Sequence, residues 1–454
     1  MAGWNPAEIL QEPNLRLTEA EVTDIRRRLP PPQDGQLYID GVFEGGGVRG
    51  IAFLGALRCF ADVGVRWRKV AGTSAGAITA ALVAADFPIE ELEQIIGNLN
   101  YVDFLTQKTS RLIWNGDPAN DLGQPIRMIL LLLLSRQLGQ YSSAPFRNWI
   151  AQTLARRNLK TFADVKADSE RDLKVVASDI SRGEMLVLPD DLDRADVADP
   201  QYRALKQLLA TPLSDCNQFE VAEAVRLSMS IPFFFEPGIL GSPKDPNARR
   251  IVDGGILSNF PLWIYDFKPN PTEPTKRCPR WPTFGLRLVE QDNRSDKPIT
   301  GPFDMLGAMF RTMMVARDQY HLNQASRDRV IEIDVTEANV TATEFNLTDE
   351  KKRTLYRLGY LHAKNFLLYA WDWENTCGGE ALNHRTAINL LAYYLRWFMA
   401  ETPLNSMTNP PSKITAARPP ANQSIQAVLS IGKTRIKNQK PQGEWHRDSV
   451  RWHF

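Results

Sequence analysis

From residue 36 onward, short apolar runs rich in β-forming residues alternate with segments whose apolar residues recur at helical spacing. The run QLYIDGVF at 36–43 is typical of a strand, and VRGIAFLGALRCFADVG at 48–64 is typical of a helix. A second short strand, WRKVAG at 67–72, precedes the Ala-rich helical segment SAGAITAALVAADF at 74–87, which Pro88 ends. This order predicts an α/β fold with a mostly parallel central sheet flanked by helices.

The same two patterns continue further along the chain. We expect strands at LKVVASDI, EMLVLPDD, RRIVDGG, TFGLRLV and RVIEIDV, which occupy 173–180, 184–191, 249–255, 283–289 and 329–335. We expect helices at APFRNWIAQTLARR, AEAVRLSMS and LTDEKKRTLYRLGYLHAKNFLLYAW, which occupy 144–157, 222–230 and 347–371. Thr348 is the expected N-cap of the last helix, because two acidic residues follow it in the first turn.

Proline and charge patterns divide the chain into four parts. Residues 1–35 are expected to form a peripheral N-terminal segment, because three consecutive prolines near its end forbid a continued helix. The core domain is expected over 36–290, and a C-terminal helical region with a late strand, packed on the core, over 291–404. Residues 405–454 form a proline-interrupted tail with eight Lys or Arg and two Asp or Glu. Such a tail is typical of solvated chain, and its charge would also suit contact with an anionic surface.

Charge and composition exclude some classes of partner and site. The 54 Lys and Arg face 53 Asp and Glu, so the net charge of +1 gives no field that would attract nucleic acid. The most apolar run, MILLLLL at 128–134, is shorter than the about 20 residues of a spanning helix. The N-terminus lacks the pattern of a signal peptide, and the four cysteines form no CxxC pair. We therefore expect a cytoplasmic protein without a zinc site or disulfide framework.

The sequence GTSAG at 72–76 lies between the second strand and the Ala-rich helix. A G-x-S-x-G in this context is the pattern of a nucleophile elbow, which exposes the hydroxyl of Ser74 on a strained turn. Gly72 and Gly76 would let strand and helix pass close to the serine. For the motif alone, an ordinary turn in which Ser74 caps the helix is the alternative.

The stretch FEGGGVRG at 43–50 could supply donors for an oxyanion. Gly45, Gly46 and Gly47 expose backbone N–H groups at the start of a helix, where the dipole also favours negative charge. Arg49 would steady this loop or attract a phosphate, and Gly50 completes the motif. The same glycines match a dinucleotide fingerprint, but the next strand offers no acidic residue and no Gly-Lys-Ser/Thr of a P-loop is present.

A candidate base follows in RRIVDGGILSNFP, where Asp253 ends an expected strand and precedes Gly254 and Gly255. Catalytic groups are common at the carboxyl ends of strands in parallel sheets. An Asp-Gly-Gly sequence is also an ordinary turn, so this motif is informative only with the other two.

Together the three motifs resemble those of the patatin-like phospholipase family, over about Tyr38 to Leu288. The resemblance includes FADV, ASDI and RLSMSIPFFFEP, and it implies a three-layer α/β sandwich. It further implies that Ser74 is the nucleophile and Asp253 the proton acceptor, with the oxyanion segment formed by Gly45 to Gly47, Arg49 and Gly50. Phe260 departs from the pattern, since many relatives have a second asparagine there, which affects the loop beyond Asp253.

The implied chemistry is acyl ester hydrolysis of a phospholipid or another acyl lipid, of the phospholipase A or lysophospholipase type. Asp253 would accept the proton of Ser74, the serine would attack the ester, and water would release the acyl-enzyme. A carboxylate needs desolvation to act as such a base, so we expect Asp253 to be buried. No metal or cofactor is required, and contact with membranes is expected to be peripheral.

Three alternatives remain open at this stage. An α/β-hydrolase triad would use Ser74, Asp253 and either His321 or His362, in the usual chain order. A CoA-dependent acyltransferase is a second enzyme alternative. The third is a catalytically idle binding or regulatory protein that keeps the fold.

Overall fold

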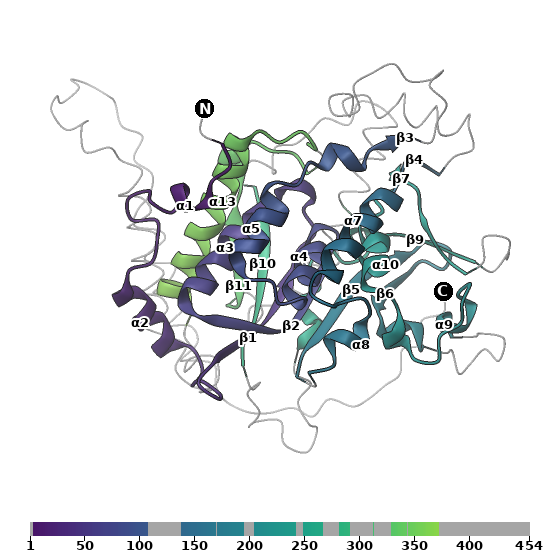
Figure 1. The fold of residues 1–454 in the computed structure, drawn as a ribbon, viewed down its shortest axis with the longest axis horizontal. Coiled ribbons are helices and arrows are strands. Elements are labelled where there is room, and N and C mark those ends of the chain that lie inside the picture. Colours follow the sequence, from purple (N-terminus) through teal and green to yellow (C-terminus); the bar gives the residue numbers. More distant parts are fainter. Residues whose placement is uncertain are drawn as a thin grey trace, which may run out of the picture. The chain divides into compact units, whose positions relative to one another are not determined.

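A computed structural model of the chain describes residues 3–107, 138–168, 170–194, 204–241, 248–266, 281–290, 312, 328–342 and 344–371. All of them belong to the first of two compact units, Met1–Tyr394 (Figure 1). The second unit, Leu395–Phe454, lies outside the described residues. The apolar run at 128–134, His321 and the tail 405–454 also lie outside them.

Eight strands of the described chain form the main sheet. Seven of them have the order β11-β10-β1-β2-β5-β9-β8, and β6 also pairs with β5. Their bounds are β1 Leu37–Phe43, β2 Val65–Thr73, β5 Asp172–Asp179, β6 Glu184–Leu188, β8 Gly238–Leu240, β9 Arg249–Asp253, β10 Thr283–Val289 and β11 Val330–Asp334. A small second sheet contains β3 Thr106–Gln107, β4 Gly139–Ser142 and β7 Phe233–Phe235.

The main sheet is parallel from β11 to β5 and antiparallel beyond it. β10 and β11, β1 and β10, β1 and β2, and β2 and β5 pair in parallel. β6, β8 and β9 pair antiparallel, β6 and β9 with β5 and β8 with β9. The expected mostly parallel sheet is confirmed, and β9 is one of its antiparallel exceptions.

Most of the helices lie between these strands along the chain, whereas α1 and α2 precede β1 and α13 follows β11. Their bounds are α1 Pro6–Ile9, α2 Glu19–Arg28, α3 Ile51–Val63, α4 Ala75–Ala84, α5 Ile89–Gly97, α7 Ala144–Ala155, α8 Phe162–Val165, α9 Leu205–Leu208, α10 Val221–Ser228 and α13 Asp349–Asn365. Short 3₁₀ turns are η1 Gly47–Gly50, η2 Tyr101–Phe104, η4 Asp190–Leu192, η5 Cys216–Gln218, η6 Gly254–Ile256, η7 Leu262–Tyr265 and η9 Thr336–Ala338, and η10 Phe366–Ala370 is a π-helical turn. Each longer helix and strand expected from the sequence pattern has a counterpart among these elements.

The central strands are buried on both faces, which is typical of a parallel sheet covered by helices on each side. Every residue of β5 from Leu173 to Asp179 is buried. On β1, Phe43 belongs to the large core cluster that includes residues of α3 and α13, whereas Val42 packs with Phe260 on the other face. The sheet is therefore the middle layer of the fold.

The two ends of the described chain contribute to this core. Ile9 and Ile25 of the N-terminal segment are fully or almost fully buried, so the segment is less peripheral than its prolines indicate. α13 lies along α3 (Figure 1), and the two backbones approach so closely that a Cβ on Gly55 would lie 1.9 Å from the carbonyl oxygen of Tyr356. Residues after 328 thus complete the sheet and cover it.

Candidate active site

Ser74 occupies a sharp turn between β2 and α4. Its φ of 54° and ψ of −122° lie outside the regions that serine ordinarily adopts, as the elbow pattern requires. The turn is tight because a Cβ on Gly72 would lie 2.2 Å from the carbonyl oxygen of Gly76. A Cβ on Gly76 would in turn lie 2.1 Å from the carbonyl oxygen of Phe43 on β1. Both glycine positions of the motif are therefore sterically required.

Asp253 lies beside Ser74 because the strands that precede Ser74 and end at Asp253 both pair with β5. Thr73, which precedes Ser74, pairs with Val176, and the next residue of β5, Ala177, pairs with Asp253. β9 runs antiparallel to β5. The carboxyl end of β9 lies near the carboxyl end of β2 because β9 is short and pairs only with the last residues of β5. The sequence pattern placed Asp253 at a strand end but did not indicate this direction.

The two side chains form a direct hydrogen bond. Ser74 Oγ donates to Asp253 Oδ2 at 2.7 Å, and the backbone N–H of Gly255 donates to Asp253 Oδ1 at 2.8 Å. Both Ser74 and Asp253 are buried. Burial raises the pKa of Asp253 to about 6, although the hydrogen bonds from Ser74 and Gly255 act in the opposite direction. The carboxylate is thus a stronger base than an exposed aspartate.

The stretch at 43–50, called the glycine loop below, lies directly against Ser74. A Cβ on Gly45 would come within 3.2 Å of Ser74 Cβ, and one on Gly50 within 3.3 Å of Ala75 Cβ. The N–H of Gly45 donates to the carbonyl of Asn259 at 2.9 Å, so it is not available to an oxyanion. The N–H groups of Gly46 and Gly47 donate to no described residue. Within the predicted oxyanion segment, the N–H groups of Gly46 and Gly47 are therefore the candidate donors to an oxyanion.

Gly47 has a φ of 58°, and a Cβ there would lie 1.9 Å from the carbonyl oxygen of Ala342. That same oxygen accepts the N–H of Val48 at 3.0 Å. The loop is therefore held from outside by residues near 342, a support that the sequence motifs did not indicate.

Side chains fix the other side of the loop. Asn259 Nδ2 donates to the carbonyl of Gly45 at 3.0 Å, which ties the loop to the chain that follows Asp253. Arg49 Nε donates to the carbonyl of Gly46 at 3.3 Å, and its guanidinium also forms an ion pair with Glu290. Arg49 thus steadies the loop, which was one of the two roles considered for it.

Ser228, at the end of α10, is a site residue that sequence reasoning missed. Its Oγ accepts the N–H of Ser74 at 2.8 Å and donates to the carbonyl of Val176 at 2.6 Å. It is fully buried. Its only sequence signal is its place in RLSMSIPFFFEP, where nothing distinguishes it from Ser230.

His362 lies away from Ser74. It is on α13, which packs on β11, and β11 is three strands from β2 in the sheet order. Three strand spacings correspond to about 14 Å. Burial lowers the pKa of His362 while the nearby Asp334 acts against that change. The structure therefore brings Ser74 and Asp253 together without this histidine between them.

In the described part of the chain, one group of three side chains could hold a metal ion: Asp193, Asp215 and Cys216. Lys206 forms an ion pair with Asp193 and so already neutralises that carboxylate. Among the described residues, every helix is too short or too polar to span a bilayer.

The model of the Patatin-like phospholipase family matches residues 41–265. "Uncharacterized protein YqhO" of Bacillus subtilis (strain 168) is 36% identical over 332 residues, which cover 73% of this chain and 98% of that protein. VipD from Legionella pneumophila is similar in structure, with 15% identity, 82% of this chain and 78% of that chain covered, and a TM-score of 0.42. The type III effector ExoU of Pseudomonas aeruginosa has 16% identity, covers 89% of this chain and 75% of its own, and gives a TM-score of 0.35. By its family model and its sequence relative, the chain belongs to the patatin-like phospholipase family.

Proposed function

We propose that this protein is a serine lipid acyl hydrolase of the phospholipase A or lysophospholipase type, with Ser74 as nucleophile and Asp253 as base. The observation that carries the proposal is the 2.7 Å hydrogen bond from Ser74 Oγ to Asp253 Oδ2. A serine on a strained turn, bonded directly to a buried carboxylate, has the nucleophile and base within the reach that covalent catalysis needs.

In the proposed reaction, Asp253 accepts the Ser74 proton while the serine oxygen attacks the carbonyl carbon of the acyl ester. The ester carbonyl oxygen becomes an oxyanion, which the N–H groups of Gly46 and Gly47 would bind together with the N–H of Ala75, the first residue of α4. Asp253 then gives its proton to the departing alcohol. Water attacks the acyl-enzyme by the reverse sequence and releases the fatty acid.

The triad alternative is less well supported by the geometry. A triad needs an imidazole between serine and carboxylate, whereas Ser74 and Asp253 are in direct contact and His362 lies on α13. His321 is outside the described residues. We therefore favour the dyad.

The family supports an acyl lipid as the substrate. Acyl lipids reside in membranes, so we propose that the protein meets them by peripheral contact from the cytoplasmic side. The chemistry needs no metal, since every proton and charge in the proposed steps is assigned to a residue of the chain.

The test is active-site labelling joined to product identification. A fluorophosphonate probe should label the purified protein at Ser74 and should not label Ser74→Ala. The protein, with and without metal chelator, is then offered phospholipids, lysophospholipids, galactolipids and triacylglycerols, and we expect release of fatty acid from at least one phospholipid class in both conditions. Undiminished labelling of Ser74→Ala would refute the assignment of Ser74 as the nucleophile. Acyl transfer seen only with a thioester donor would favour an acyltransferase.

A further inference from the structure

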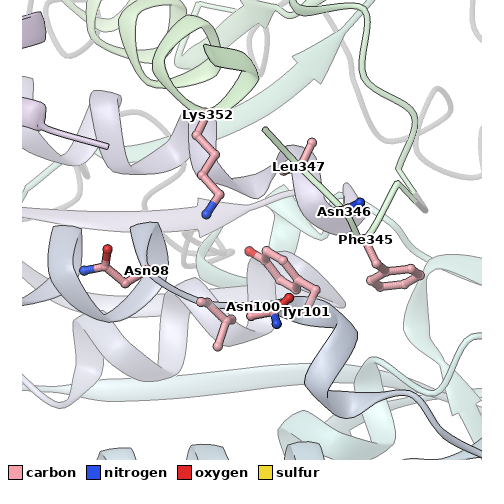
Figure 2. Close-up of a pocket in the computed structure, with 8 residues that line it drawn as sticks. Asn98, Asn100, Tyr101, Phe345, Asn346, Leu347 and Lys352 are labelled. Atoms are coloured by element: carbon pink, nitrogen blue, oxygen red, sulfur yellow. The ribbon is translucent and has the colours of Figure 1, made fainter. Parts of the chain in front are cut away.

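A small polar cavity lies between the end of α5, the turn η2 and the start of α13. Its volume is about 130 Å³, and its lining includes Asn98, Tyr101, Phe345, Asn346 and Lys352 (Figure 2). Pockets for drug-sized ligands are larger, about 300–1,000 Å³, and mostly apolar. The cavity therefore suits a small polar group and not an acyl chain.

Lys352 places a positive charge in the cavity. The residue is buried, and its Nζ donates to the carbonyl of Gly97, the last residue of α5, at 2.8 Å. The Asp349 carboxylate lies 4.0 Å from Nζ, beyond hydrogen-bond distance, and also accepts the N–H of Trp4 at 3.2 Å. An ammonium has three N–H donors, so a ligand can accept from those that Gly97 does not use.

Tyr101 adds a donor that has no partner among the described residues. Its hydroxyl forms no hydrogen bond with a described residue, and in Figure 2 it points toward the same space as the Lys352 ammonium. Burial raises the pKa of Tyr101, so the hydroxyl stays protonated and able to donate. The Tyr101 ring is held in place by Phe345, whose ring centre is 6.4 Å away.

A hydroxyl and an ammonium that converge on a cavity favour an oxyanion, and the Asp349 carboxylate is too distant to accept a hydrogen bond from the ammonium. Desolvation lowers the pKa of Lys352, which means that its charged form lacks full compensation. Lysine binds phosphate as a point charge, and charge-assisted hydrogen bonds to it are stronger than neutral ones. The cavity also lies at the N-terminal end of the 17-residue helix α13, whose dipole favours negative charge.

We propose that this cavity binds a phosphate group through Lys352 and Tyr101. Free phosphate, a soluble phosphate monoester and the exposed headgroup of phosphatidic acid share this chemistry. The bound group would accept hydrogen bonds from Lys352 Nζ and from the Tyr101 hydroxyl.

The cavity is linked to the glycine loop by one short segment. Phe345 and Asn346 line the cavity, and three residues before Phe345 the carbonyl of Ala342 accepts the N–H of Val48 at 3.0 Å. Phe345 also stacks on Phe234, with ring centres 5.0 Å apart. Phosphate binding should therefore hold Ala342, whose carbonyl supports the glycine loop, more firmly in place. We expect this to increase the rate at which Ser74 reacts with a fluorophosphonate. This consequence rests on the proposed function, whereas the binding itself does not.

The test is calorimetric titration of the full-length protein at constant ionic strength. One arm uses inorganic phosphate and one uses glycerol 3-phosphate. A third uses phosphatidylcholine vesicles with and without phosphatidic acid. We expect saturable binding that weakens at least about tenfold in both Tyr101→Phe and Lys352→Met, because each loses a donor to a charged group. Lys160→Met, which removes an exposed lysine elsewhere, should bind as the unaltered protein does.

The arms identify the source of the phosphate. Binding of the soluble anions supports a free ligand, and binding confined to phosphatidic acid vesicles supports a lipid headgroup. Absence of binding in all arms, or equal binding by the unaltered protein and the Tyr101→Phe variant, would overturn the proposal. Tyr101→Phe decides the matter should Lys352→Met fail to fold, since it removes a single oxygen that has no described protein partner. Calorimetry reports the site even in a protein that the fluorophosphonate does not label, so the two proposals can fail separately.

Discussion

Ser74 and Asp253 are 179 positions apart in the sequence, and the serine hydroxyl donates to the aspartate carboxylate at 2.7 Å. The contact depends on β5, which pairs in parallel with the strand before Ser74 and antiparallel with the strand that ends at Asp253. A shift of β9 by one residue would turn the carboxylate to the other face of the sheet. The geometry of the proposed dyad thus depends on the register of β9 with β5.

Asp253→Asn should lower kcat/KM at least about 10³-fold, because an amide cannot accept the Ser74 proton. The substitution preserves size and leaves an oxygen for the N–H of Gly255. Hydrolysis of a soluble p-nitrophenyl ester measures the loss, and circular dichroism confirms the fold. Turnover within tenfold of the unaltered enzyme would show that Asp253 is not the base.

The pKa of Asp253, raised by burial to about 6, predicts both a rate profile and a stability difference. Since the base must be ionised, kcat/KM should fall about tenfold per pH unit below about pH 6. Because the folded pKa lies above the unfolded value of 3.8, the stability contribution of Asp253 is fully present below about pH 4 and is lost as pH rises to about 6.

The Asp253→Asn variant has no carboxyl to titrate at this position. The free energy of unfolding of the variant minus that of the unaltered protein should therefore rise between pH 4 and pH 7, by up to about 3 kcal/mol. Denaturant unfolding at the two pH values measures this gain. An inactive variant whose relative stability does not rise with pH would mean that the Asp253 carboxyl is not held at a raised pKa.

The sequence predicted the strand and helix order and the position of Ser74 because these depend on local periodicity and on one turn motif. It could not predict that β9 is antiparallel, because strand direction depends on pairing with β5 and not on the residues of β9. Ser228 and Ala342 were missed for a related reason. Each acts through one atom on a distant backbone group, and such a contact leaves no pattern in the sequence. The cavity lined by Tyr101 and Lys352 likewise joins distant segments, since Lys352 bonds to a carbonyl 255 positions away.

His362→Ala should keep kcat/KM within a few-fold, whereas loss of a triad histidine costs on the order of 10⁴-fold. The reason is its place on α13 against β11, three strands from the serine. The same ester assay applies, after coincident unfolding transitions have shown that the variant folds as one unit. A folded but inactive His362→Ala would favour a triad.

Ser228→Ala should lower kcat about 10- to 100-fold, because Ser74 loses the acceptor that holds its N–H and small displacements at a reacting group are costly. It should also cost about 1–3 kcal/mol, since a buried N–H and the carbonyl of Val176 lose their partner. Ser230→Ala is the matched control: it is buried at the same helix end, but its hydroxyl donates to the carbonyl of Arg226. Equal activity loss in both variants would mean that Ser228 acts only through stability.

Gly47→Ala should disable the glycine loop through steric conflict. Gly47 has a φ of 58°, and its added Cβ would lie 1.9 Å from the carbonyl oxygen of Ala342, so the loop or the segment near 342 must move. Gly183 has a similar φ of 70°, but a Cβ there meets nothing within 4 Å. Gly183→Ala thus carries the backbone strain alone, about 1–2 kcal/mol, and should keep full activity.

Comparison of Gly47→Ala with Gly183→Ala separates the effect of backbone strain from the effect of displacing the glycine loop. We expect Gly47→Ala to lose at least about 100-fold in kcat, because each oxyanion donor contributes about 10²–10³-fold and a displaced loop misplaces the N–H groups of both Gly46 and Gly47. Thermal unfolding and ester hydrolysis are measured for both. A Gly47→Ala enzyme that is destabilised like Gly183→Ala yet fully active would exclude this loop as the oxyanion site and leave Ala75 as the remaining candidate donor.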